Sequence, residues 1–187
     1  PVEFLPDVPF RFSCLAYYNP EDTTEGTDGM LIFTLQTFDN GQQNTNGKSK
    51  KPSVSLLSYS LKEKNFKLID KISEPSGGIM CTNLTINSTG QYAAMDLFME
   101  GPQMKNYTLV YDLSSAEKVD IVDLLEISNY QSTIDIQDDD LNEDYISQSI
   151  NLNSVFWNKN GLVFSVRIYQ QSMNFNYQPE LKKVEAS

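Results

Sequence analysis

The chain has 187 residues, of which 40% are hydrophobic and 21% are charged, as is usual for a globular domain. Its net charge is −11 and it contains no histidine, which disfavours nucleic-acid binding and excludes histidine-based acid–base catalysis and histidine-containing zinc sites. The longest apolar runs are far too short to cross a bilayer, so we expect one soluble domain over residues 1–187 that is not membrane-spanning.

The first repeat-like unit covers residues 10–72 and is rich in β-forming residues. We predict strands at 10–18, 30–38, 53–61 and 65–72, separated by an acidic loop at 19–29 and a long polar loop at 39–52. The chain starts with Pro1 and not with Met, which suggests that a leader, a propeptide or another domain preceded it. We therefore expect an extracytoplasmic or secreted protein.

The second unit, residues 79–123, has the clearest strand pattern. Predicted strands lie at 82–86, 91–99, 106–113 and 117–122. In the third of them, the period of two expected of a half-buried strand places alternate residues on one face, namely Tyr107, Leu109, Tyr111 and Leu113. These four strands in a row predict an antiparallel meander.

A third copy opens at residue 149 and runs to 184. Residues 154–161 correspond to 84–90 of the second unit, residues 162–168 alternate cleanly, and the tail 175–184 is predicted as a third strand with no fourth strand after it. The internal repeat predicts about three blade-like units. Any helix is expected within residues 114–131.

Two phrases of these units resemble β-propeller repeats. Residues 155–165 (VFWNKNGLVFS) and 109–113 (LVYDL) resemble the strand–turn–strand and exit-strand phrases of TolB-like and WD-like repeats. The resemblance implies that Trp157 is a packing residue and that Asp112 caps a tight turn. Propellers typically close with about 4–8 blades. We therefore predict an all-β, antiparallel meander of about three blade-like repeats, a partial propeller, with a β-sandwich or barrel as the alternative.

An acidic insertion at 124–148 separates the second and third units. Asp138, Asp140 and Asn142 have the spacing that opens a calcium loop, but Glu143 stands where the loop needs glycine and Ser149 where it needs a bidentate glutamate. We interpret the insertion as a solvated acidic loop. Calcium is the single candidate cofactor, and these three residues are the weak candidate ligands.

Cys14 and Cys81 are the two cysteines; Cys14 lies in the first predicted strand of its unit, and Cys81 lies at the start of the first predicted strand of the second unit. If neighbouring units pack side by side, the two sulfur atoms come close enough for a disulfide. Two buried, reduced thiols are an equally good interpretation. Metal binding by two cysteines alone is not expected.

Three functions agree with these patterns. The first is a non-catalytic, extracytoplasmic binding or scaffold domain that contacts a protein or a surface polymer; the second is a carboxylate-based hydrolase; the third is a calcium-dependent adhesive or structural module. We predict the first, with no catalytic or cofactor-binding residue assigned. The hydrolase would have to use acids such as Asp96, Glu100 and Asp112. Candidate binding aromatics are Tyr17, Tyr18, Tyr169, Phe175 and Tyr177.

Overall fold

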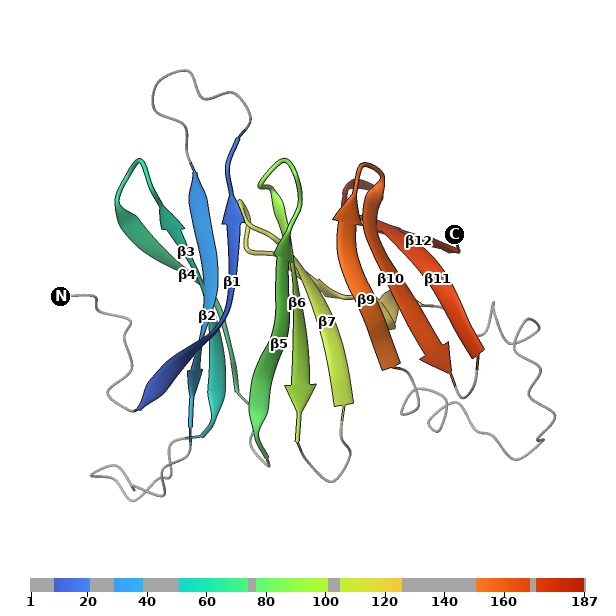
Figure 1. Cartoon of the computed structure of the whole chain (residues 1–187), viewed down its shortest axis with the longest axis horizontal. Helices are drawn as coiled ribbons and strands as arrows, with labels where there is room; N and C mark the ends of the chain where they lie inside the picture. The colour runs from blue at the N-terminus through green and yellow to red at the C-terminus, as the bar shows by residue number, and fades with distance from the viewer. Residues whose placement is uncertain are drawn as a thin grey trace.

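The described strands of the protein form three separate antiparallel sheets. The computed structural model describes residues 9–20, 29–38, 51–73, 77–100, 105–125, 151–168 and 171–186. Each sheet has four strands, and the three sheets stand side by side in chain order (Figure 1). This confirms the predicted all-β, antiparallel class. Within the described ranges, none of the three sheets closes into a barrel.

Every sheet is a simple meander in which each strand pairs with the next one along the chain. The first sheet contains β1 (Phe10–Tyr18), β2 (Met30–Thr37), β3 (Ser53–Ser60) and β4 (Asn65–Ser73). The second contains β5 (Ile79–Ile86), β6 (Tyr92–Met99), β7 (Lys105–Asp112) and β8 (Lys118–Asp120). The third contains β9 (Asn151–Asn158), β10 (Gly161–Ile168), β11 (Gln171–Gln178) and β12 (Lys183–Ala186).

The third sheet corrects one prediction. The tail expected as one strand at 175–184 is two strands, β11 and β12, joined by a single 3-10 turn, η2 (Pro179–Leu181). Pro179 lacks a backbone N–H and cannot continue a strand ladder, and Lys182 takes a left-handed conformation with φ of 48°. The third unit therefore has the same four strands as the first two. The one α-helix in the described ranges, α1 (Ile121–Leu124), lies where helix was expected.

Two apolar cores hold the three sheets together, one on each face of the second sheet. One core joins β2 and β3 of the first sheet to β5, β6 and β7, and the other joins β6, β7 and α1 to β10 and β11. Tyr111 and Leu113 of the β7 segment lie in the first core, whereas Val110 lies in the second. The alternation predicted for this segment is thus correct. The expected half-buried strand is wrong, because both of its faces are covered.

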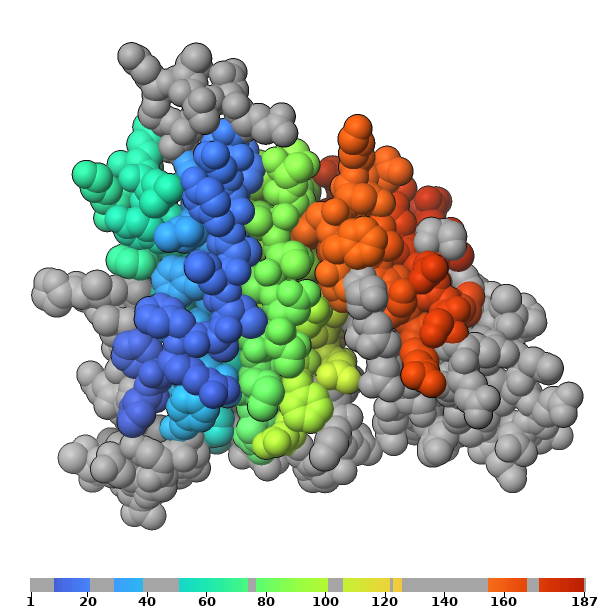
Figure 2. Space-filling model, in the orientation of Figure 1, coloured from blue at the N-terminus to red at the C-terminus, as the bar shows by residue number. Residues whose placement is uncertain are grey.

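A bulge interrupts the first strand of every sheet. The register shifts between Phe12 and Leu15 in β1, between Cys81 and Asn83 in β5, and along β9 opposite Val163 and Ser165. Bulges increase the local twist of a strand. The first strands of the first and second sheets, β1 and β5, lie next to each other, as Figure 2 shows.

Polar contacts also link the first sheet to the second. The hydroxyl of Tyr111, a fully buried residue, donates a hydrogen bond of 2.9 Å to the Asp70 carboxylate on β4. Lys118 on β8 forms an ion pair of 2.6 Å with the same carboxylate. Burial raises the pKa of Asp70, but the hydrogen bonds from Lys118 and Tyr111 outweigh it and bring the pKa below its ordinary value.

Candidate binding surface

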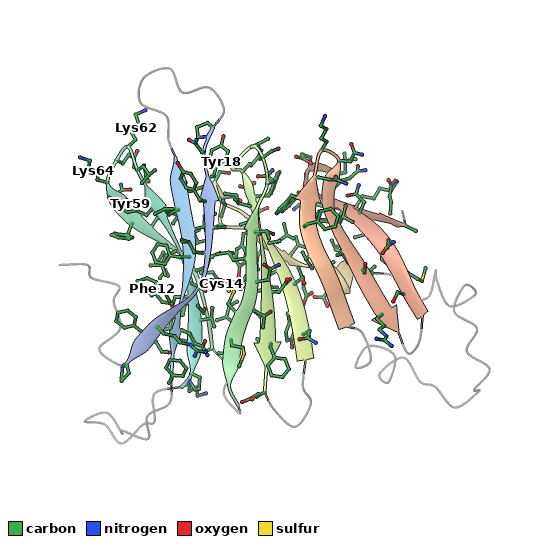
Figure 3. All side chains as sticks on the ribbon, viewed as in Figure 1. Phe12, Cys14, Tyr18, Tyr59, Lys62 and Lys64 are labelled. Carbon is green, nitrogen blue, oxygen red and sulfur yellow. The ribbon has the colours of Figure 1, made fainter. Side chains whose placement is uncertain are left out.

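The side of the first sheet that faces away from the second is a broad apolar surface. The strand register places six exposed residues on this side: Phe10, Phe12, Leu15 and Tyr17 on β1, and Phe66 and Leu68 on β4. We call this surface the outer apolar face. Figure 3 shows Phe12 and Tyr59 on this side, while Cys14 lies between β1 and β5.

Aromatic rings connect the strands across the outer apolar face. Phe33 on β2 contacts Phe12 on β1, with ring centroids 5.5 Å apart, and Phe66 on β4, with centroids 6.0 Å apart, both edge to face. Phe10 continues the row from Phe12 at 6.2 Å, and Tyr59 packs on Phe66 at 4.6 Å. These geometries suit the quadrupoles of aromatic rings. The rings hold one another in place, so the surface is preformed.

The exposed apolar area is large for an isolated surface. Phe12 and Leu15 are 66% and 65% exposed, and the other four exposed members are 37% to 51% exposed. With about 200 Å² for each large apolar side chain, the six members together expose roughly 600 Å². That equals the upper end of the largest apolar patches on typical monomers, which often mark interaction sites. The outer apolar face is therefore the best candidate for a binding surface.

The opposite end of the molecule has a different character. On the outward side of the third sheet, the register places Phe156 and Val163 among polar residues, including Ser165, Asn174 and Asn176. The Ser165 hydroxyl and the Asn174 side-chain oxygen lie 2.7 Å apart, within hydrogen-bond distance. Because this face carries mainly polar side chains and little apolar area, it does not match an apolar partner.

A pair of thiols lies where β1 meets β5. The Cys14 thiol donates a hydrogen bond of 3.4 Å to the Cys81 carbonyl oxygen, and the Cys14 N–H donates one of 3.0 Å to the Thr34 hydroxyl. Both cysteines are free thiols in this structure. As predicted, they lie on the first strands of neighbouring sheets. Formation of a disulfide between them remains a prediction.

The two thiols differ strongly in acidity. The hydrogen bond with the Cys81 side chain is the main reason that the pKa of Cys14 falls to about 7, against the opposing effect of burial. The same hydrogen bond, with burial, raises the pKa of Cys81. A thiol with a pKa near 7 is substantially ionised at neutral pH, and thiolates are the reactive form. Cys14 is the more reactive partner.

Two of the three carboxylates considered for a hydrolase, Asp96 and Asp112, make separate local contacts. Asp96 accepts hydrogen bonds from Asn83 at 3.0 Å and from Thr108 at 2.7 Å, and burial raises its pKa. Asp112 accepts hydrogen bonds from Ser114 in the β7–β8 turn, as the propeller resemblance implied.

Strand geometry keeps these carboxylates apart. Asp96 pairs across the sheet with Thr108, and Asp112 lies four residues farther along β7, which is about 13 Å at the rise of a strand. Glu100 likewise follows Asp96 by four residues and lies just beyond the end of β6. The pairs that include Asp96 exceed the roughly 5–9 Å found in glycosidases. The register therefore does not assemble the acid pair that the hydrolase hypothesis requires of these residues.

The other predicted site residues divide into four groups. Tyr17 is half exposed and belongs to the outer apolar face, whereas Phe175 and Tyr177 are buried in the core between the second and third sheets. Tyr18 packs close to Gly90, where a Cβ atom would lie 2.6 Å from its ring. Asp138, Asp140, Asn142 and Tyr169 lie outside the described residues.

Sequence reasoning missed most of the outer apolar face. Phe10, Phe12 and Leu15 are large apolar residues on one strand, a pattern that predicts a core face. The sequence contained one signal of the actual orientation of β1: the residues on its other side, Ser13, Cys14 and Ala16, are small and allow a neighbouring sheet to pack closely there.

In the described ranges, no group of three or more histidine, cysteine, aspartate or glutamate side chains is arranged to hold a metal ion. No helix in those ranges combines the length and the apolar character needed to cross a membrane. No family model matches the chain, and a search of curated proteins finds no match either.

Proposed function

We propose that this chain is a non-catalytic binding or scaffold domain that acts outside the cytoplasm and contacts a protein. The observation that carries the proposal is the outer apolar face, with roughly 600 Å² of exposed apolar side chain on a sheet whose rings hold one another in place. A rigid sheet that presents a preformed apolar surface loses little conformational entropy on binding.

The chemistry of the outer apolar face favours a protein over a surface polymer. Tyr17 is the one member of the six exposed residues that has a hydroxyl group. Recognition of a hydroxylated polymer needs hydrogen-bonding groups as well as rings, whereas an apolar protein surface is matched by phenylalanine and leucine alone. We therefore take an apolar surface of a protein as the partner.

The proposed compartment predicts that the thiol pair is oxidised. Cys14 and Cys81 lie next to each other where β1 meets β5, and disulfides persist in oxidising compartments. The proposed architecture remains that of a partial propeller, since three meanders of four strands stacked in chain order agree with the resemblance drawn from the sequence. Three blades are fewer than closed propellers typically have.

Site-specific photocross-linking tests the binding function. A photoreactive phenylalanine analogue replaces Tyr17 on the outer apolar face, and in the control chain it replaces Phe156, an exposed aromatic on the third sheet. We expect covalent protein adducts from position 17 and none from position 156. Equal labelling at both positions, or none at position 17, would contradict the proposal.

A turnover screen tests the non-catalytic part. Glycoside, peptide and phosphoester substrates are incubated with the wild-type chain and with the Asp96→Ala and Asp112→Ala variants. We expect no turnover above the buffer rate. Reproducible turnover that disappears in either variant would identify an enzyme and overturn the proposal.

A further inference from the structure

We propose that the outer apolar face packs against the same face of a second copy of this chain, so that the protein is a face-to-face dimer. This inference rests on the proposed function and names the partner. It is supported by the burial pattern of the first sheet, the area of the face, its charge, and the contrast between the two ends of the molecule.

The first sheet has the burial pattern of a layer that is covered on both faces. From Ile32 to Thr37, every residue of β2 is buried, whichever face it points to. Continuous burial of this kind is typical of a strand with a layer on each side. The second sheet supplies one layer through the core that contains Ile32 and Leu56. On the other side, the ring of Phe33 is covered by Phe12 and Phe66, whose own outer surfaces remain exposed.

The area matches what a dimer needs. A standard stable interface buries about 800 Å² on each partner. The six exposed members of the outer apolar face supply roughly 600 Å² of it, before any contribution from neighbouring residues. Buried aromatic residues are also the usual hot spots of such interfaces, and four of the six members are aromatic.

Charge does not oppose this contact. The chain has a net charge of −11, which would repel a second copy at an acidic surface. Among the described strand residues whose side chains point to the outer apolar face, however, Lys71 is the only charged one. It is basic and lies on the edge strand β4. Within the described ranges, no acidic side chain therefore lies at these positions, and the single Lys71 adds little repulsion to the contact.

The two ends of the molecule select the symmetry of the dimer. Head-to-tail stacking would place the outer apolar face on the outward side of the third sheet, whose residues include Ser165, Asn174 and Asn176. That contact would bury polar groups without matching partners, which is costly. Packing the outer apolar face on itself buries rings against rings. The isologous, two-fold arrangement is thus favoured, and it closes at two copies.

Analytical ultracentrifugation over a range of concentrations tests the inference. We expect the wild-type chain to sediment as a dimer that dissociates on dilution. Phe12→Asp should weaken the dimer at least tenfold, and Leu15→Asp should do the same, since both side chains are more than half exposed. We expect the circular dichroism spectrum of both variants to match that of the wild-type chain, which shows that the fold is retained. The matched control, Phe156→Asp, replaces a half-exposed phenylalanine on the third sheet and should leave the dimer unchanged.

Three results would overturn the inference: a wild-type monomer at every concentration, a dimer that Phe12→Asp and Leu15→Asp leave intact, or a dimer that Phe156→Asp weakens equally. The photoreactive analogue at position 17 separates this failure from failure of the proposed function. A covalent product of two identical chains supports the dimer. Adducts with another protein from a monomeric chain retain the binding function but refute the dimer, and the absence of any adduct refutes both.

Discussion

Replacing Tyr111 with phenylalanine removes the hydroxyl that ties the second sheet to the first. Tyr111 is fully buried and donates a 2.9 Å hydrogen bond to Asp70, an ionised acceptor on β4. Hydrogen bonds to charged groups contribute about 1.5–3 kcal/mol to folding stability. We therefore expect Tyr111→Phe to lower the free energy of unfolding at pH 7 by about 2 kcal/mol. With a urea dependence of about 2 kcal/mol per M, the denaturation midpoint falls by about 1 M.

The pH dependence distinguishes this hydrogen bond from a packing effect. The pKa of Asp70 is lower in the folded protein than in the unfolded chain, so its contribution to stability is present above the unfolded value near 3.9. That contribution is lost as the pH falls through the folded pKa. Because Asp70 becomes neutral there, the difference between wild type and Tyr111→Phe should shrink below about pH 4.

Tyr177→Phe is the matched control for this prediction. Tyr177 is also buried, lies in the other core, and makes no hydrogen bond through its hydroxyl with any described residue. Urea denaturation followed by circular dichroism, repeated from pH 7 to pH 3, measures both variants. If Tyr111→Phe costs no more than Tyr177→Phe, or if its cost does not change with pH, the charge-assisted tie between the sheets is wrong.

Three further predictions concern other parts of the chain. The alkylation rate of Cys14 should rise with pH with a midpoint near 7, and Cys81→Ala should move that midpoint upward; an unchanged midpoint would contradict the thiol hydrogen bond. Gly90 has a φ of 73° and contacts an aromatic ring, so Gly90→Ala should lower the free energy of unfolding by more than about 1 kcal/mol. Ala116 has a φ of 61°, so Ala116→Gly should raise this free energy by up to about 1 kcal/mol, and thermal unfolding measures both variants. Calorimetry should show at most millimolar calcium affinity for the acidic 138–142 segment, and micromolar affinity would restore the calcium-loop hypothesis.

Much of the strand pattern was predictable because it depends on local chemistry. Alternation in the 107–113 segment and the turn residues at Asn87–Gly90 determine the second meander with little help from the rest of the chain. In that turn the Gly90 N–H donates to the Asn87 carbonyl, and the Asn87 side chain accepts from the Tyr92 N–H. The fourth strand of the third sheet was missed because β12 has four residues and follows a proline, which together give a weak strand signal.

The placement of the layers could not be predicted from the same patterns. Periodicity shows that one face of a strand is apolar, but it does not show whether one or both faces are covered. The β7 segment has apolar residues on both faces, Tyr111 toward the first sheet and Val110 toward the third. A half-buried strand was therefore expected where the structure has a fully buried one. Similarly, Phe175 and Tyr177 lie at a predicted strand near the C-terminus, yet the packing of the third sheet buries them.

The orientation of β1 is the reverse of the one that side-chain size suggests, and this has a physical cause. Its small residues, including Cys14 and Ala16, pack toward the second sheet, whereas Phe12 and Leu15 point outward. Small side chains let the backbones of β1 and β5 approach closely enough for the Cys14 thiol to reach the Cys81 carbonyl at 3.4 Å. Successive side chains of a strand point to opposite faces of its sheet. Because small residues occupy the inner positions of the bulged strand β1, its large apolar residues lie on the outer side. The close fit between the first two sheets therefore leaves the outer apolar face exposed, and covering that face from water with a second copy supplies the driving force for the dimer.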